Sequence, residues 1–161
     1  MSDQSKTSMA VSRRGLLGVF GGGALAVAGA TLTPKSAQAT PDKAAELAKK
    51  LSGKMPAGGD ARVSLKLPEI AENGNTVPVT VKVESPMTAA DHVKKIHIIS
   101  EGNPNPGVCS FTLSAECGKA EVATRIRMAK TQNIVAVAEM SDGSVISNKK
   151  ETKVTIGGCG G

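Results

Sequence analysis

The chain has 161 residues, of which 40% are hydrophobic, and a formal net charge of +6. Its length allows one small domain with extensions, and the only aromatic residues are two phenylalanines, too few for the stacking surface that single-stranded nucleic acids require. Lys6, Arg13, Arg14 and Lys35 against Asp3 account for half of the net charge. The remaining charges are interspersed, so we expect a mildly basic solvated surface and no nucleic-acid interface.

The first 39 residues have the pattern of an export signal. Arg13-Arg14 precedes an uncharged run, rich in Ala and Gly, from Leu16 to Leu32, and Ala37-Gln38-Ala39 is a small-x-small cleavage pattern. This order is typical of a secretory signal peptide, and the paired arginines indicate the twin-arginine class. The alternative is a membrane anchor, for which the run is short and weakly hydrophobic. We therefore expect the mature chain to lie in the periplasm, without a membrane segment.

Residues 40–60 predict a short helix and a linker. Thr40 is a hydroxyl cap that precedes a proline and an acid, as helix starts prefer, and Gly53 follows two lysines. Between them, one apolar stripe at helical spacing contains Ala44, Leu47, Ala48 and Leu51. The sequence leaves open whether this stripe packs on its own domain or on another subunit. The residues from Lys54 to Asp60 read as linker.

Residues 61–156 predict a β-sandwich. Apolar and polar residues alternate in short segments, which we expect as strands near residues 63–67, 76–83, 96–99, 111–115, 122–128, 134–138 and 154–156. Turn residues separate these segments at 72–75, 102–107, 118–119 and 142–143. Roughly seven or eight short strands, with no βαβ pattern, favour an all-β, antiparallel sandwich.

The segment 157–161 reads Gly-Gly-Cys-Gly-Gly and carries one reactive side chain, the thiol of Cys159. Glycine favours a mobile backbone, and five extended residues reach roughly 17 Å. Such a tether provides neither the fixed orientation nor the neighbouring base that a catalytic thiol needs. We therefore expect Gly157, Gly158, Gly160 and Gly161 to form a flexible arm that presents Cys159 as a covalent carrier group. We expect no catalytic residue in the chain.

Cys109 and Cys117 bring the cysteine count to three, so an exported chain keeps at least one thiol outside internal bridges. If residues 109–117 form one strand, the two Cα atoms lie about 26 Å apart, whereas a disulfide allows about 7 Å. An internal bridge needs a turn within residues 110–116, where the sequence shows none. The favoured alternative buries Cys109 and leaves Cys117 free or bonded to another subunit.

His92 and His97, with Asp91 adjacent, are the remaining metal-binding candidates. Structural and catalytic metal sites use three or four converging ligands, and two histidines five residues apart are better explained as strand or surface residues. No Ser-His-Asp set, phosphate loop or Cys-x-x-Cys motif is present in the sequence. We therefore expect neither a metal nor another cofactor.

Several short motifs resemble the SoxY family, the sulfur carriers of the Sox thiosulfate-oxidation pathway. They cover most of the mature chain and are Asn73-Gly74, Val77-Pro78-Val79, Ser85-Pro86-Met87-Thr88, Asn103-Pro104-Asn105-Pro106, Thr124-Arg125-Ile126-Arg127 and the segment from Val154 to Gly161. The Gly-Gly-Cys-Gly-Gly terminus is the most specific of these motifs. The twin-arginine signal also fits the family.

The resemblance implies an immunoglobulin-like sandwich that forms an obligate heterodimer with SoxZ. It also implies that the haem enzyme SoxAX conjugates thiosulfate to the cysteine that matches Cys159. SoxB then releases sulfate by hydrolysis, and other Sox enzymes process the remaining sulfur. Cys109 and Cys117 depart from the family pattern of a single terminal cysteine, and an intersubunit disulfide is one role for them.

Two other function classes compete with the carrier. A structural subunit, such as an adhesin or scaffold, needs no thiol chemistry and predicts that deleting residues 157–161 leaves function unchanged. A thiol enzyme acting alone predicts a cysteine that is alkylated at a pH well below neutral. The plain chemical surroundings of Cys159 favour the carrier over both.

Overall fold

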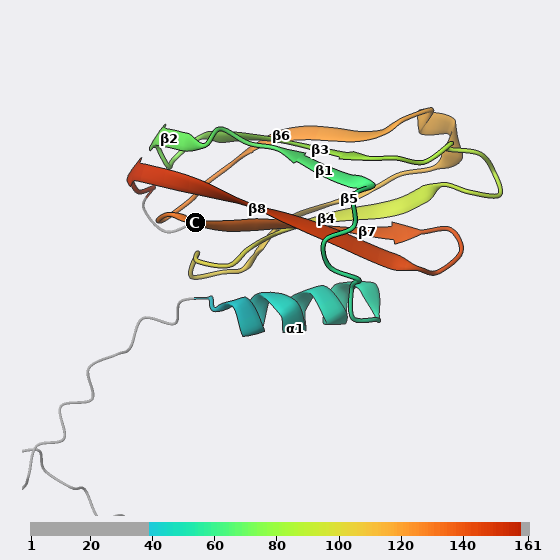
Figure 1. Cartoon of the computed structure of the whole chain (residues 1–161), viewed down its shortest axis with the longest axis horizontal. Coiled ribbons are helices and arrows are strands. Elements are labelled where there is room, and N and C mark those ends of the chain that lie inside the picture. The colour runs from blue at the N-terminus through green and yellow to red at the C-terminus, as the bar shows by residue number, and fades with distance from the viewer. Residues whose placement is uncertain (1–38, 159–161) are drawn as a thin grey trace, which may run out of the picture. The chain divides into compact units, whose positions relative to one another are not determined.

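The computed structural model describes residues 39–158, which form one helix and eight strands (Figure 1). The elements are α1 (Pro41–Ser52), β1 (Val63–Lys66), β2 (Ile70–Asn73), β3 (Val77–Val83), β4 (Val93–Ser100), β5 (Gly107–Thr112), β6 (Ala120–Ile126), β7 (Gln132–Met140) and β8 (Val145–Ile156), with a 3₁₀ turn at Ala115–Cys117.

The strands form two sheets, one on top of the other. The smaller sheet has the order β1-β3-β6, and the larger has the order β2-β8-β7-β4-β5. The all-β sandwich with one N-terminal helix is therefore confirmed. Every pairing between these strands is antiparallel except that of β2 with β8, which is parallel and departs from the purely antiparallel expectation. The immunoglobulin-like assignment stays a prediction.

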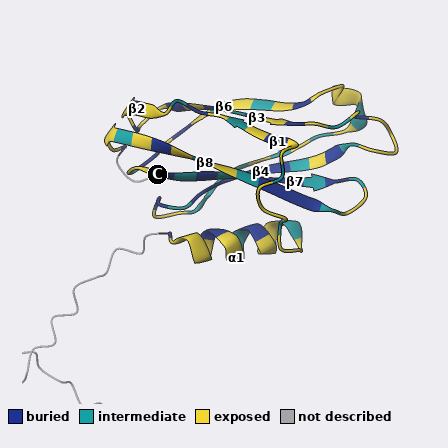
Figure 2. Ribbon diagram, viewed as in Figure 1, coloured by how far each residue is buried: buried dark blue, intermediate teal, exposed yellow. Residues whose placement is uncertain are grey.

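The core lies between the sheets and is made of aliphatic side chains. In β3, alternate residues from Val77 to Val83 point inward and are at most 2% exposed, while the residues between them are partly or fully exposed. Ile96 and Ile98 of β4 and Ile134 of β7 meet them from the larger sheet. Figure 2 shows this alternation of buried and exposed positions along the strands. The period of two in the sequence thus predicts the inward faces correctly.

β5 begins four residues before the strand expected at 111–115 and ends at Thr112, and two further strands, β2 and β8, differ more from the sequence expectation. β2 was not expected as a strand: its last two residues fall in the turn expected at 72–75, and only Ala71 within it is buried. β8 extends over twelve residues, although only its last three were expected as strand. The charged run at residues 149–151 hides the alternation, since this part of β8 faces solvent on one side. Both strands are defined by their pairing partners and not by a local pattern.

Helix α1 packs on the face of the larger sheet that points away from the core (Figure 1). Thr40 caps the helix by accepting a hydrogen bond from the amide of Lys43 at 3.4 Å, and Gly53 ends it in the left-handed conformation. Ala44 and Ala48 are buried against this sheet, so the apolar stripe packs on its own domain. Leu51, at its end, is 39% exposed. Within residues 39–158, no helix has the length and apolar character needed to cross a bilayer.

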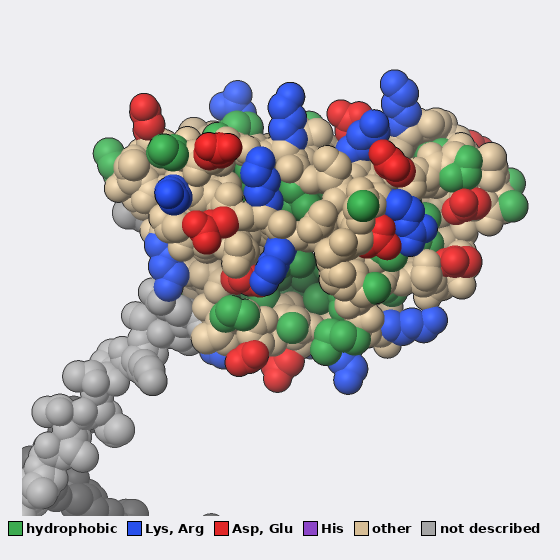
Figure 3. All heavy atoms as spheres, in the orientation of Figure 1, with side chains coloured by type: hydrophobic (Ala, Val, Ile, Leu, Met, Phe, Trp, Pro, Cys, Tyr) green, Lys and Arg blue, Asp and Glu red, His purple; other side chains and the backbone are tan. Residues whose placement is uncertain are grey.

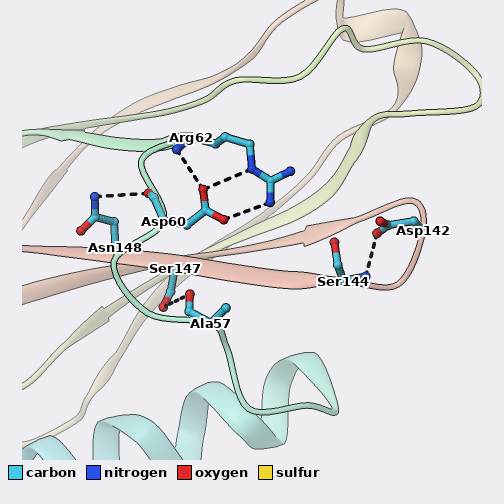
Figure 4. Close-up of polar contacts among 7 residues, drawn as sticks. All are labelled: Ala57, Asp60, Arg62, Asp142, Ser144, Ser147 and Asn148. Atoms are coloured by element: carbon cyan, nitrogen blue, oxygen red, sulfur yellow. Dashed lines mark hydrogen bonds and ion pairs between the residues drawn. The ribbon is translucent and has the colours of Figure 1, made fainter.

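The linker expected after the helix is fixed to β8. Ala57 accepts a hydrogen bond from the amide of Ser147 and donates one to Val145, forming a short parallel bridge. Asp60 then forms a salt bridge with Arg62 at 2.9 Å, and Asn148 contacts the Asp60 backbone (Figure 4). The hydrogen bonds from Arg62 lower the pKa of the Asp60 carboxyl. The segment therefore belongs to the folded body.

The charged side chains are distributed as the sequence suggests. Figure 3 shows Lys and Arg side chains interspersed with Asp and Glu on the displayed face. No block of one sign dominates this view, which agrees with a solvated, mildly basic surface.

Candidate functional site

The end of β8 is joined to two other segments by backbone hydrogen bonds. The amide of Gly74, in the β2–β3 turn, donates to the carbonyl oxygen of Ile156 at 2.7 Å. The amide of Met128, just after β6, donates to the Gly74 carbonyl at 2.7 Å, and the Gly158 amide donates to the Met128 carbonyl at 3.0 Å. We call this set, Gly74, Met128, Ala129, Gly157 and Gly158, the arm root. It places the residue before Cys159 against the sandwich.

Three glycines of the arm root have no space for a side chain. A Cβ at Gly74 would overlap the carbonyl oxygen of Met128, and one at Gly157 would overlap that of Ala129. A Cβ at Gly158 would lie 2.8 Å from the carbonyl oxygen of Gly74. Glycine is thus required here because backbones approach closely. The sequence assigned Gly157 and Gly158 to flexibility alone and missed this steric requirement.

Cys159, Gly160 and Gly161 lie outside the described residues. The expected mobility of this part of the arm stays a prediction, as does the carrier role of its thiol. The described geometry defines where the segment begins. Gly158 is buried, and it lies at the end of the sandwich where the β2–β3 turn and the β6–β7 connection meet.

A buried asparagine holds the segment on which the arm root rests. The Asn103 side chain, on a residue that is 2% exposed, accepts hydrogen bonds from the Ala129 amide at 2.9 Å and from the Gln132 side chain at 2.7 Å. It also donates to the Arg127 carbonyl at 2.8 Å. Gln132 in turn accepts from the Gly102 amide at 2.6 Å. These contacts fix the chain on both sides of Met128.

Several of the motifs that suggested the family therefore converge at one place. Asn73-Gly74, Asn103, Arg127 and the segment after Val154 all lie at the arm root. The Ser85–Thr88 motif follows the far end of β3 and does not take part. Sequence reasoning identified these motifs but not their contact, because each belongs to a different strand end.

Cys109 and Cys117 are both free thiols. β5 ends at Thr112, and the chain turns at Ala115–Cys117, so the expectation of one continuous strand without a turn was wrong. The turn expected at 118–119 directly follows this segment, and Gly118 adopts the left-handed conformation there. No bridge joins Cys109 to Cys117 despite this turn, and the intersubunit disulfide stays a prediction.

The two thiols differ in their surroundings. Cys109 is partly buried and packs with Phe111 against the core, on the side expected from their shared parity. Burial raises the pKa of the Cys109 thiol, which lowers its thiolate fraction at a given pH. Cys117 is exposed, with its sulfur 4.0 Å from the hydroxyl of Ser114. The exposed thiol is the more accessible of the two.

His97 lies in a chain of hydrogen bonds that the sequence did not reveal. Its Nδ1 is 2.7 Å from the Ser110 hydroxyl, and its Nε2 is 2.7 Å from Glu139 Oε1. An ionised carboxylate only accepts, so Nε2 donates to Glu139. The His97 side chain is 5% exposed, and both ring nitrogens have partners. This Ser-His-Glu set links the neighbouring strands β5, β4 and β7, and it explains the residue as a structural histidine.

Metal ligands do not converge in the described part of the chain. Within residues 39–158, no group of three or more His, Cys, Asp or Glu side chains is placed to hold a metal ion. His92 instead contacts the Thr88 carbonyl through Nδ1 at 3.1 Å.

Comparison with known proteins identifies the family. Residues 48–159 match the family described as sulfur oxidation protein SoxY. A search of curated proteins found no match. Among solved structures, the sulfur carrier protein SoxY from Chlorobium limicola f thiosulfatophilum is 34% identical, with a TM-score of 0.60, and the alignment covers 70% of this chain and 92% of that one.

Other similar structures share the fold alone. A superoxide reductase (neelaredoxin) from Ignicoccus hospitalis is 22% identical, with a TM-score of 0.52 and coverage of 72% and 94% of the two chains. A putative superoxide reductase from Thermotoga maritima is 16% identical, also with a TM-score of 0.52, and covers 62% and 93%. The family match over most of the folded chain and the 34% identical structure are more specific. The chain belongs to the SoxY family of sulfur oxidation proteins.

Proposed function

We propose that this chain is a covalent carrier of sulfur intermediates during thiosulfate oxidation, with the substrate attached to the thiol of Cys159. The observation that carries the proposal is the extent of the family match, which ends at Cys159. The similar SoxY from Chlorobium is described as a sulfur carrier protein. The glycine neighbours of Cys159 carry no side chain that could shield its sulfur, which suits a group that must enter several active sites.

The chemistry divides into an oxidation and a hydrolysis. In the first step, the thiol and thiosulfate form a sulfur–sulfur bond and give protein–S–S–SO3⁻, one proton and two electrons. A partner redox enzyme must accept these electrons, and SoxAX, a haem enzyme, is the proposed acceptor. In the second step, water attacks the terminal sulfone, giving sulfate, one proton and protein–S–SH. SoxB is the proposed catalyst of this hydrolysis.

This chain's own contribution is therefore attachment and presentation, not catalysis. A thiol flanked by glycines has no base or cation on the adjacent residues of the chain to activate it. Its reactivity must come from each enzyme that receives it. We further propose that the chain functions as a heterodimer with SoxZ, and that residues 1–39 direct it to the periplasm by the twin-arginine route before removal.

Replacement of the proposed carrier atom tests the function. Cys159→Ser should abolish sulfate release from thiosulfate by the reconstituted pathway enzymes, because serine cannot form the sulfur–sulfur bond. Cys117→Ser is the matched control, since it removes an exposed thiol elsewhere, and it should retain activity. Cys159→Ser should bind SoxZ with unchanged affinity, because Cys159 follows the described sandwich. Retained sulfate release by Cys159→Ser would disprove the carrier role.

A further inference from the structure

We propose that Gly74 and Asn103 are positioning residues for the carrier thiol: together they hold Gly157 and Gly158 on the sandwich, so that free movement of the arm begins at Cys159. This inference rests on the proposed carrier function. The sequence predicts a flexible tether of five residues, 157–161. The proposal shortens that tether to at most the three residues 159–161.

The first support is the backbone hydrogen bonding at Gly74. Its amide donates to Ile156 and its carbonyl accepts from Met128, while Met128 accepts from Gly158. Gly74 is therefore the central residue between the end of β8 and the segment after β6. Gly158 is buried and its amide has a partner. A tether that simply left the sandwich at Ile156 would have neither property.

The second support is the absence of space around the same residues. A Cβ at Gly74 would meet the Met128 carbonyl oxygen and would lie 2.7 Å from the amide nitrogen of Gly158. An alanine at this position must therefore displace either the β6–β7 connection or the arm. Asn103 restrains that connection through Arg127 and Ala129, so the arm is the part with more freedom to move.

The third support is the independent bracing of β8 beside the arm root. The amide of Val154 donates to the Thr131 hydroxyl at 2.9 Å, and the Thr155 hydroxyl donates to the Glu72 carbonyl at 3.0 Å. These bonds hold the end of β8 between its two neighbouring segments. Val154 and Thr155, which precede the arm, are thus held by neighbouring segments on both sides of β8.

The consequence is a short reach for the thiol. Measured from Ile156, the Cα atom of Cys159 is three residues away and reaches about 10 Å, whereas from Gly158 it is one residue away, ~3.8 Å. A shorter tether confines the thiol to one end of the sandwich and raises its local concentration there. Enzymes that receive the thiol must then dock close to the β2–β3 turn and the β6–β7 connection.

Backbone relaxation measured by NMR tests the proposal directly. With the mature chain purified with its co-exported subunit, the ¹⁵N–¹H NOE values of Gly157 and Gly158 should match those of β8, while Gly160 and Gly161 should show the low values of a mobile end. Gly74→Ala should lower the values of Gly157 and Gly158 and leave those of β4 unchanged. Gly58→Ala is the matched control, because nothing lies within 4 Å of its Cβ position.

A spin label on Cys159, in a chain with Cys109→Ser and Cys117→Ser, gives the second measurement. Signal broadening should be confined to residues near the arm root and should spread over the sandwich in Gly74→Ala. If Gly157 and Gly158 of the unsubstituted chain are as mobile as Gly160 and Gly161, the proposal is wrong, whether or not Gly74→Ala folds. Neither measurement involves sulfur chemistry, so a failure of the carrier function would be seen separately, as absent adducts on Cys159.

Discussion

The amide of Gly158 donates a hydrogen bond to the carbonyl oxygen of Met128 at 3.0 Å, which connects the end of β8 to the segment that follows β6. This contact means that the residue immediately before the proposed carrier cysteine is part of the folded body. The glycines around Cys159 therefore have two different reasons to be glycine. On the N-terminal side they allow backbones to pack closely, and on the C-terminal side the sequence predicts mobility.

Asn103→Ala should destabilise the sandwich end that carries the arm. The substitution leaves the Ala129 amide and the Arg127 carbonyl without this partner in a partly buried region, and it removes one of the two acceptors of the Gln132 side-chain amide. Each buried polar group left unsatisfied costs about 1–3 kcal/mol, and relaxation offsets part of this, so we expect a loss of about 2–4 kcal/mol in the free energy of unfolding. Urea denaturation of the variant and of the unsubstituted chain measures this loss.

Asn105→Ala is the matched control for this prediction. The Asn105 side chain accepts one hydrogen bond, from the Gly107 amide at 3.2 Å, and its surroundings are exposed. The expected loss is about 1 kcal/mol or less. Equal losses for the two variants would show that the Asn103 contacts do not brace the β6–β7 connection.

Cys109 should react more slowly with an alkylating reagent than Cys117. Burial raises the pKa of Cys109, so at neutral pH its reactive thiolate fraction is smaller, and its rate–pH profile should shift to higher pH. Chains in which either thiol is the only remaining cysteine allow separate measurement. Unfolding in urea should make the two rates equal. A faster reaction at Cys109 in the folded chain would contradict the described burial.

Cys159 should form no intrachain disulfide with Cys117. Cys117 precedes β6, which spans about 20 Å at ~3.3 Å per residue, whereas Gly158, the residue before Cys159, contacts Met128 after that strand. The Cα of Cys159 lies within ~3.8 Å of that of Gly158, and a disulfide requires Cα atoms within about 7 Å. Oxidation of the purified chain should therefore join cysteines of two separate copies, and a non-reducing gel should show the cross-linked dimer. A monomer with an internal 117–159 bridge would require a different placement of the arm.

The sequence predicts those parts of the fold that have a strong local pattern. The apolar stripe of α1 and the alternation in β3 identify their buried faces, because those faces meet a core directly. β2 and most of β8 lack such a pattern. Their positions depend on pairing with each other, at contacts such as Ala71 with Val154, and a non-local pairing leaves little trace in a short segment.

The sequence suggests the chemistry of the candidate site, which stays a prediction, but it does not reveal the structure of the arm root. Cys159 was recognisable because it is the one reactive side chain among glycines. The role of Gly74 was not, since Asn73-Gly74 has the signature of an ordinary turn, and its contact with Gly158 joins segments from opposite ends of the domain. Likewise, Asn103 lies in a proline-rich loop that reads as exposed, although it is buried.

Mass spectrometry of the peptide that contains Cys159 tests the carrier function most directly. The mature heterodimer would be incubated with thiosulfate and its pathway enzymes, without reductant, and digested after turnover. The carrier mechanism predicts an S–SO3 or sulfur-atom addition on Cys159, reversed by dithiothreitol, with Cys109 and Cys117 unmodified. An unmodified Cys159 during active sulfate release, or an adduct found on Cys117 instead, would contradict it.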